Sequence, residues 1–174
     1  GYQALIMLPE IGLTSQFQKR FLEFFNFEPA IWHSNVSKKN KKIIWRGVLE
    51  NKIKAVVGAR SSLFLPFNKL GTIIVDEEHD SSYKQDEGII YNARDMAVSR
   101  ASFEKIPINL VTSIPSVETF NNVLNKKYSV SYLKKRYKNA SLPRFEVIDL
   151  NKKKINKKNW IALETIEKVD SHLK

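Results

Sequence analysis

Short apolar runs alternate with longer amphipathic segments along most of the chain. Runs that are apolar on both faces are typical of strands buried in a parallel sheet. Such runs occupy residues 3–8, 30–33, 54–58, 71–75 and 107–111. We therefore expect these segments to form the strands of one sheet.

The segments between these runs carry apolar residues at helical spacing. Thr14 or Ser15 can cap the first helix, and Pro115 can open a later one. The expected apolar stripes are Phe17, Phe21, Leu22, Phe24 and Phe25; Ile43, Ile44, Trp45, Val48 and Leu49; and Val117, Phe120, Val123 and Leu124, with a further helix at Ala93–Glu104. Strict alternation of strand and helix predicts an α/β fold with a mainly parallel sheet, right-handed crossovers and helices on both faces.

The pattern changes after residue 126, where the core of the domain is expected to end. Residues 128–133 and 145–150 look like two further strands, which complete the domain over residues 127–150. The loop between them is basic and contains Lys134, Lys135, Arg136 and Lys138. Residues 151–174 are predicted to form a Lys-rich linker at 152–158 and an amphipathic helix at 160–173.

One apolar run ends abruptly in charged residues. Residues 71–80 read Gly-Thr-Ile-Ile-Val-Asp-Glu-Glu-His-Asp. In a parallel sheet, ligands bind at the carboxyl ends of the strands, which is where Asp76 and Glu77 would lie. Such carboxylates can hold Mg²⁺ through its water shell and orient an attacking water. The other interpretation, a solvated acidic loop after a core strand, stays open on this motif alone.

Composition narrows the class of protein and the kind of partner. Hydrophobic residues at 43% and charged residues at 27% describe a soluble globular protein, and we expect no membrane association and a cytoplasmic location. The absence of cysteine excludes disulfides and thiolate metal sites. A formal charge of +11 favours a polyanionic partner such as nucleic acid. A compositional bias towards solvated lysines is the alternative.

The strand ends, read together, resemble one family. The motifs that carry the resemblance are residues 8–14, 33–34, 58–64, 76–85, 91 with 93–95, and 115–116 with 118. In this order they resemble the first motor domain of the primosomal replication-restart helicases, the family of primosomal protein N-prime, which are DEAH-type superfamily 2 DNA helicases. The most specific strings are Leu-Pro-Glu-Ile-Gly-Leu-Thr and Asp-Glu-Glu-His-Asp-Ser-Ser-Tyr-Lys-Gln. The resemblance implies a three-layer RecA-like fold of the P-loop NTPase type.

The resemblance implies a catalytic role for the acidic motif. Asp76 and Glu77 would be the Walker B pair, with Asp76 on the Mg²⁺ of bound ATP through water and Glu77 polarising the attacking water. His79 would be the third catalytic residue and would link this site to the turn after the fifth strand, unless it is a plain surface histidine. The residues implied in coupling ATP hydrolysis to DNA are Glu78, Thr112, Ser113 and Pro115.

The resemblance also implies contacts with single-stranded DNA. Gly58 would permit close approach, Arg60 would supply charge, and hydroxyl groups would donate to phosphates. Tyr83 and Tyr91 would stack on bases, while Lys84 and Arg94 face phosphates. The full predicted set is Pro9, Glu10, Gly12, Thr14, His33, Ser34, Gly58, Arg60, Ser61, Ser62, Tyr83, Lys84, Tyr91 and Arg94. The alternatives are a surface or capping role for Arg60 and an anchoring role for Tyr91 in the core.

The chain departs from the family pattern in three places, one of them at Ile89 and Ile90, where the family often has an aromatic or basic residue. No Gly-x-x-x-x-Gly-Lys-Ser/Thr loop occurs, although the family carries it just upstream of the strand at residues 3–8. We expect a truncation just after this Walker A loop, so that the chain alone neither hydrolyses ATP appreciably nor unwinds DNA. Zinc is expected only in a family module that this chain lacks. In the turn after the fifth strand, Ile114 replaces a family threonine that helps coupling.

The sequence thus predicts part of an ATP-dependent DNA helicase that acts in replication restart and primosome assembly. Its expected cofactors are ATP and Mg²⁺, and its expected partners are single-stranded or forked DNA and other primosome proteins. The alternative is a non-catalytic nucleic-acid-binding module with a vestigial ATPase site. A third hypothesis, a metal hydrolase built on Asp76, Glu77, His79 and Asp80, would require these near-consecutive residues to converge on one ion.

Overall fold

The computed structural model describes residues 1–9, 15–134, 141, 143–150 and 161–173. The chain divides into two compact units, Gly1–Val130 and Ser131–Lys174. The first unit contains every strand of the described residues.

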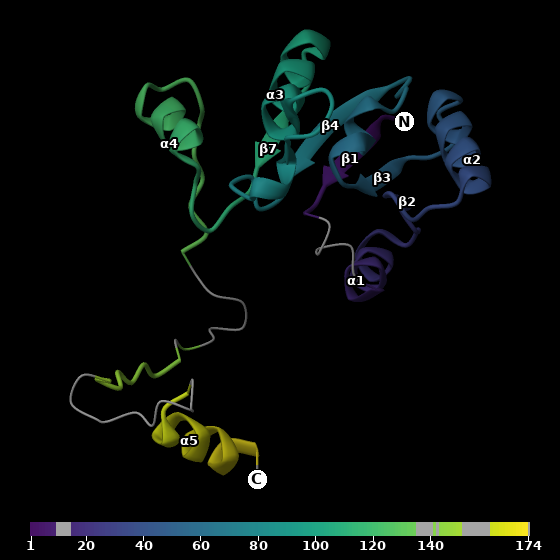
Figure 1. The fold of residues 1–174 in the computed structure, drawn as a ribbon. Helices are drawn as coiled ribbons and strands as arrows, with labels where there is room; N and C mark the ends of the chain where they lie inside the picture. Colours follow the sequence, from purple (N-terminus) through teal and green to yellow (C-terminus); the bar gives the residue numbers. More distant parts are fainter. Residues whose placement is uncertain (10–14, 135–140, 142, 151–160, 174) are drawn as a thin grey trace. The chain divides into compact units, whose positions relative to one another are not determined.

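A parallel sheet forms the centre of the first unit (Figure 1). It is 5-stranded, in the order β2-β3-β1-β4-β7, and each pair of neighbours is parallel. Its members are β1 (Gln3–Met7), β2 (Ala30–Trp32), β3 (Ala55–Gly58), β4 (Leu70–Val75) and β7 (Ile108–Leu110). Each of the expected apolar runs overlaps one of these strands, with β4 starting one residue before its run, so the prediction of a mainly parallel sheet is confirmed.

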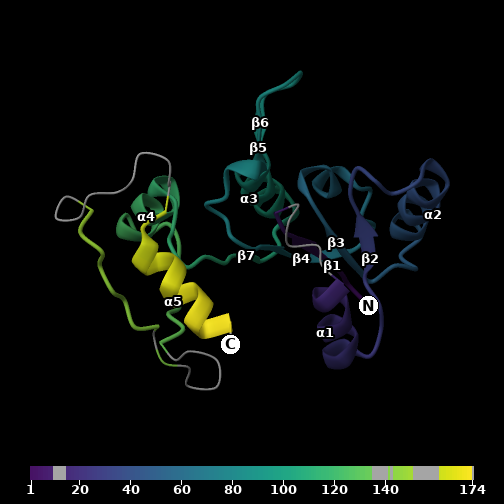
Figure 2. The ribbon, with the colours of Figure 1, turned by 60° about the horizontal axis from the view of Figure 1, so that its bottom comes forward.

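Helices cover both faces of this sheet. Figure 2 shows α1 (Ser15–Phe25) on the side opposite to α2 (Lys38–Leu49) and α3 (Ala93–Glu104). The main core lies on the side of α2 and α3, where their buried residues pack against the sheet. The buried residues of this core include Leu5, Met7, Val48, Val56, Ile73, Val75, Ala93, Ala97 and Ala101. The predicted three-layer α/β arrangement is therefore confirmed.

Side-chain caps set where the helices begin. The Ser37 side chain accepts a hydrogen bond from the Asn40 amide and starts α2. Asn92 starts α3 in the same way, and Ser116 starts α4 (Val117–Leu124) one residue after Pro115. These caps satisfy amides that the helix itself leaves free.

A buried glutamine ties three segments of the first unit together. Gln3 of β1 is 1% exposed. Its amide nitrogen donates to the carbonyls of Val48 (2.9 Å) and Ile53 (2.8 Å), and its oxygen accepts from the amides of Asn68 and Lys69. Because every polar atom of the amide has a partner, its burial carries no penalty of an unmade hydrogen bond.

Several apolar residues that were expected in the core lie at the surface. In α1 only Phe21 is buried, and Phe24 is 84% exposed. The ring of Phe21 instead packs in an aromatic cluster with Phe25 and Phe27, at centroid distances of 4.5 Å and 5.5 Å. In α2 only Val48 is fully buried, while Trp45 is 47% exposed. Helical spacing identified these faces but not how much of each one is covered.

The segment between β4 and α3 contains elements that the apolar pattern did not reveal. The short helix η3 (Ser81–Tyr83) leads into a two-stranded antiparallel hairpin, β5 (Lys84–Gln85) and β6 (Tyr91–Asn92). Figure 2 shows this hairpin extending away from the main sheet. Another short helix, η2 (Arg60–Phe64), follows β3. Strands of two residues are too short to produce a periodic signal.

The two strands predicted at residues 128–133 and 145–150 are wrong. All of these residues are described, and none forms a strand. Their alternating apolar side chains face solvent, with Leu133 95% and Val147 94% exposed. A strand needs a neighbouring strand to bond its backbone, and alternation of side chains does not supply one.

The second unit contains α5 (Leu163–Leu173), which lies inside the predicted helix at 160–173. The basic residues Lys135, Arg136 and Lys138 and the predicted linker at 152–158 fall outside the described residues. None of the helices in the described part of the chain has the length and apolar character needed to cross a membrane.

Candidate functional site

The strands of the main sheet end in register. Trp32 pairs with Gly58, Gly58 with Met7, Met7 with Val75, and Val75 with Leu110. The segments that follow these residues therefore leave the same edge of the sheet, the carboxyl edge expected for a ligand site. They begin at Leu8, His33, Ala59, Asp76 and Val111.

Asp76 and Glu77 lie at this edge directly after β4. The Asp76 amide donates to the Met7 carbonyl (3.0 Å), and the Asp76 carboxylate accepts from the Glu77 amide (3.0 Å). Glu77 is exposed and has a φ of 47°, in the left-handed region that residues other than glycine rarely adopt. Backbone strain of this kind concentrates at functional sites. The Asp76 carboxylate is therefore held by a backbone amide, and both carboxylates remain accessible to solvent.

His79 contacts the turn that follows β7. Its Nδ1 lies 2.7 Å from the Thr112 hydroxyl and 3.6 Å from the Glu77 carboxylate. The Thr112 hydroxyl donates to the Ile114 carbonyl (2.7 Å), so it can only accept from His79. This network assigns the proton of a neutral His79 to Nδ1. The expected link between the acidic motif and the turn after the fifth strand is present in the structure.

Glu78 points into the protein and joins three elements. Its carboxylate accepts from the amide and the hydroxyl of Ser116 (2.7 Å and 2.9 Å), from the Thr119 hydroxyl (3.0 Å) and from the Arg94 guanidinium (3.1 Å). Arg94 also donates to the Asp95 carboxylate (2.8 Å) and to the Ser116 hydroxyl (2.6 Å). The network connects the end of β4 to the first turns of α3 and α4.

The hydrogen bonds decide the charge state of this buried pair. Burial by itself raises the pKa of Glu78, but the bonds donated by Ser116, Thr119 and Arg94 outweigh it and hold the pKa below its ordinary value. Burial likewise opposes the charge of Arg94, whereas its bonds to Asp95 and Glu78 raise its pKa. Both groups are therefore charged in the folded protein.

Tyr83 was predicted to stack on a DNA base, and the structure places it in the core instead. It is 1% exposed, and its hydroxyl lies 3.0 Å from the Met7 carbonyl and 2.7 Å from the Asp76 carbonyl. Burial, followed by the nearby Asp76, Asp80 and Glu77, raises the pKa of this hydroxyl. A ring with no free face cannot stack on a base, so Tyr83 instead fixes the backbone beneath Asp76.

Three other predicted DNA contacts also point inward. Arg94 is 6% exposed and is occupied by carboxylates, so it faces no phosphate. The Ser62 hydroxyl is buried and donates to the Ala59 carbonyl (2.6 Å). A Cβ at Gly58 would lie 2.5 Å from the Trp32 carbonyl oxygen, so the glycine permits internal packing rather than approach of a ligand.

The remaining predicted DNA contacts lie at or near the surface. Arg60 donates to the Lys84 carbonyl (2.8 Å), and the Lys84 ammonium lies 3.0 Å from the Asp86 carboxylate. Tyr91 packs edge-on against Phe64 and is partly buried, in agreement with the anchoring alternative. Exposed or partly exposed DNA-contact positions also include Pro9, His33, Ser34 and Ser61, and the predicted coupling residues Ser113 and Pro115 are exposed as well. Glu10, Gly12 and Thr14 lie outside the described residues.

The metal-hydrolase hypothesis is not supported. The described residues, which include Asp76, Glu77, His79 and Asp80, contain no group of three or more acidic or imidazole side chains that could hold a metal ion. Asp80 instead caps η3, because its carboxylate accepts from the Ser82 amide (2.7 Å), and this bond lowers its pKa. Two accessible acids without a protein cage suit Mg²⁺, which keeps several waters and is usually shared with substrate phosphates.

Sequence reasoning missed two partners of the site. The Thr119 hydroxyl donates a hydrogen bond to the buried Glu78 carboxylate. The Trp32 indole nitrogen donates to the Ser61 hydroxyl (3.1 Å). Ser116, a favoured N-cap residue directly after Pro115, was an available signal for a helix start, but nothing in it pointed to Glu78.

Comparison with known proteins identifies the family. The family model described as DEAD/DEAH box helicase matches residues 1–123. The replication restart protein PriA of Rickettsia conorii is 52% identical over 173 residues, which are 99% of this chain and 27% of that protein. The PriA proteins of Haemophilus influenzae and Bacillus subtilis are 40% and 35% identical over 99% and 98% of this chain, and 23% and 21% of their own lengths.

These matches confirm the resemblance to the replication-restart helicases and, with the parallel sheet, the RecA-like fold. The chain spans about a quarter of the length of the curated relatives it matches. Since the helicase family model covers well over half of its residues, the chain belongs to the DEAD/DEAH box helicase family.

Proposed function

We propose that this chain is the part of an ATP-dependent DNA helicase that carries the Walker B carboxylates, and that the parent protein acts in replication restart and primosome assembly. One observation carries the proposal. Asp76 and Glu77 stand accessible at the carboxyl end of β4, next to a histidine that is bonded to the turn after β7.

The residues present fit Mg-ATP. Asp76 would hold Mg²⁺ through water, and Glu77 would polarise the water that attacks the terminal phosphate. Bound Mg²⁺ supplies charge stabilisation to the phosphate being transferred. The backbone of Asp76 is held by the Met7 carbonyl and the Tyr83 hydroxyl, and the Asp76 carboxylate accepts from the Glu77 amide, so this segment is ordered without a ligand. Such pre-organisation is what phosphoryl transfer demands of the protein.

Single-stranded or forked DNA would contact the same edge of the sheet. The accessible groups available for its phosphates are Arg60, Lys84, Ser34 and Ser61. The name of the relatives, replication restart protein, supports a role in replication restart. Other primosome proteins as partners and a cytoplasmic location are part of the same proposal. No zinc role is proposed for the residues of this chain.

Coupling between DNA and ATP hydrolysis would pass through two contacts. His79 forms a hydrogen bond with Thr112, and Glu78 forms one with Ser116. Two residues of the acidic motif therefore contact the segment between β7 and α4. A shift of that segment would therefore change the position of Glu77. Ser113 and Pro115 lie in the same segment.

The alternative, a non-catalytic module, is motivated by Ile114, whose side chain is 70% exposed in this turn. The intact contact between His79 and Thr112 favours the enzyme, because this contact forms despite the altered turn. Titration of labelled single-stranded DNA with the full-length protein, at two salt concentrations and with or without Mg-ATP, separates the two. An ATP-dependent change in affinity supports the enzyme, and salt-sensitive binding that nucleotide leaves unchanged supports the module.

A further inference from the structure

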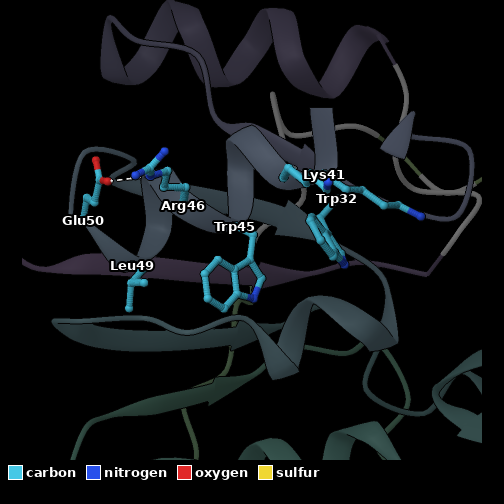
Figure 3. A pocket seen from close by; sticks show the side chains of 7 residues that line it. Trp32, Lys41, Trp45, Arg46, Leu49 and Glu50 are labelled. Carbon is cyan, nitrogen blue, oxygen red and sulfur yellow. Dashed lines mark hydrogen bonds and ion pairs between the residues drawn. The ribbon is translucent and has the colours of Figure 1, made fainter. Parts of the chain in front are cut away.

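An open groove lies between α2 and β2, away from the acidic motif (Figure 3). Its volume is about 670 Å³. Trp32 lines it from β2, one of the two edge strands of the main sheet, and Trp45, Arg46 and Leu49 line it from α2. Figure 3 shows the two indole rings projecting from neighbouring elements toward the same side. This groove on α2 and β2 has no role in the function proposed above.

The groove presents aromatic surface to solvent. Trp45 is 47% exposed and Leu49 is 43% exposed, although α2 is otherwise a strongly polar helix. Positions 42, 45 and 49 are three or four residues apart and share one face of the helix, so Lys42 lies next to Trp45. An accessible indole beside cations is the arrangement that binds an unpaired base together with its phosphates.

The positive charges in the first turn of α2 are unfavourable for the stability of the helix. Its sequence Lys-Lys-Asn-Lys-Lys-Ile-Ile-Trp-Arg-Gly-Val-Leu has no acid in the first turn. Because the positive end of the helix dipole lies there, lysines at these positions weaken the helix. A polyanion bound along α2 would offset this repulsion, which gives the lysines a reason beyond solubility.

The single acid among the described residues that line the groove is paired with cations at the end of α2, so it does not neutralise the lysines near the start of the helix. Glu50 is engaged by Arg46 (3.0 Å) and Lys52 (2.6 Å) at the far end of α2. Lys41, near the start of α2, lies over the Trp32 ring at 5.9 Å and donates to the Ser34 carbonyl (3.1 Å). The Trp32 indole in turn donates to Ser61 (3.1 Å). The groove is therefore bonded directly to Ser34 and Ser61, two of the predicted DNA contacts at the carboxyl edge of the sheet.

We propose that this groove binds single-stranded nucleic acid, with one base stacked on Trp45 and its neighbouring phosphates on Lys41 and Lys42. The strand would leave the carboxyl edge of the sheet at Ser34 and Ser61 and continue along α2. The inference rests on the proposed function only in expecting a nucleic-acid partner. A peptide rich in acids would use the same cations but would gain little from an aromatic ring over an aliphatic side chain.

Fluorescence anisotropy of a labelled oligothymidylate with the 174-residue chain tests the stacking. Trp45→Phe keeps a ring and is expected to bind within about 2-fold of the wild type. Trp45→Leu keeps the apolar contact but loses the ring, and its affinity is expected to fall by about 5-fold or more. Phe103→Leu, at an 87% exposed position of α3, is the matched control and should leave affinity unchanged. Circular dichroism checks that each variant is folded.

Cross-linking locates the strand independently of any substitution. Irradiation of an oligonucleotide that contains 5-iodouracil, followed by mass spectrometry, is expected to mark the peptide that contains Trp45. Wild-type affinity in Trp45→Leu would overturn the proposal, as would cross-links confined to the peptides of the other strand ends. A second outcome concerns oligoglutamate as a competitor of DNA. If oligoglutamate displaces DNA equally well from the wild type and from Trp45→Leu, and the two proteins bind DNA with the same affinity, the groove would be assigned to an acidic peptide instead. None of these experiments measures ATP hydrolysis, which a Glu77 variant tests independently. Failure of the groove proposal can therefore be distinguished from failure of the proposed function.

Discussion

The Arg94 guanidinium lies 3.1 Å from the Glu78 carboxylate, and the two side chains are 7% and 0% exposed. Glu78 belongs to the acidic motif after β4, and Arg94 belongs to the first turn of α3. Isolated buried charges are strongly unfavourable, whereas a pair with its remaining lone pairs satisfied is tolerated. Ser116 and Thr119 supply those remaining bonds. The orientation of the acidic motif is therefore fixed by an ion pair whose loss would strongly destabilise the folded chain.

Replacing Glu78 with glutamine tests this relationship. Glu78→Gln leaves Arg94 without its buried counter-charge, and we expect a loss of about 3 kcal/mol in the free energy of unfolding. The measurement is urea unfolding of the 174-residue chain, followed by circular dichroism. Glu118→Gln is the control, because Glu118 lies 3.7 Å from the same guanidinium but is 71% exposed. That surface pair is expected to contribute less than about 1 kcal/mol. Equal effects of the two substitutions would contradict the account.

The same carboxylate predicts how stability depends on pH. The pKa of Glu78 is lower in the folded chain than its ordinary value of 4.5, so the unfolded chain takes up its proton first as pH falls. The stabilisation is complete above about pH 4.5 and is lost as pH falls through the folded pKa. The difference in unfolding free energy between wild type and Glu78→Gln should therefore narrow on acidification. Asp80 is present in both proteins, so its contribution to the pH dependence cancels in this difference. A difference in unfolding free energy that stays constant with pH would refute the prediction.

Tyr83 separates a structural role from a DNA contact. Tyr83→Phe removes the hydroxyl that reaches the carbonyls of Met7 and Asp76, and we expect about 1–2 kcal/mol of lost stability. Affinity for single-stranded DNA should stay within about 2-fold, because the ring is buried. Chemical unfolding and anisotropy titration measure the two quantities on the same samples. A large loss of affinity at unchanged stability would restore Tyr83 as a base-stacking residue.

The sequence predicted most of the sheet, because each strand is a run of apolar residues bounded by polar ones, as in residues 71–75 before Asp76. It also placed Asp76 and Glu77 at the carboxyl edge, since strand direction alone determines that position. It did not predict which polar residues fold inward. Arg94, Tyr83 and Ser62 look suitable for a ligand by residue type, and only the packing of η2, η3 and α3 against the sheet shows them to be internal.

The errors in the second half of the chain have a different cause. The alternation at residues 145–150 fits a strand, but pairing depends on a partner that no local pattern encodes. The hairpin of β5 and β6 shows the converse case. It forms because η3 and the start of α3 hold its ends, although each of its strands has two residues.

The contact between His79 and Thr112 predicts a measurable coupling in the full-length protein that contains this chain. Thr112→Val removes the hydroxyl that accepts from His79, and we expect the stimulation of ATP hydrolysis by DNA to fall by about 10-fold. A double-mutant cycle with His79→Ala tests whether the two residues act together. If they do, the double variant is about as impaired as the worse single variant. Strictly additive effects on the free energy of activation would mean that the contact transmits nothing.

The central claim is that Glu77 polarises the water that attacks ATP. The most direct measurement is ATP hydrolysis by the full-length protein in the presence of single-stranded DNA, with Glu77→Gln compared with the wild type. Loss of a positioned general base should lower the turnover number by about 100-fold or more. Glu87→Gln, at an exposed position of the β5–β6 hairpin segment, is the matched control and should hydrolyse ATP at the wild-type rate. Turnover by Glu77→Gln within about 2-fold of the wild type would contradict the account.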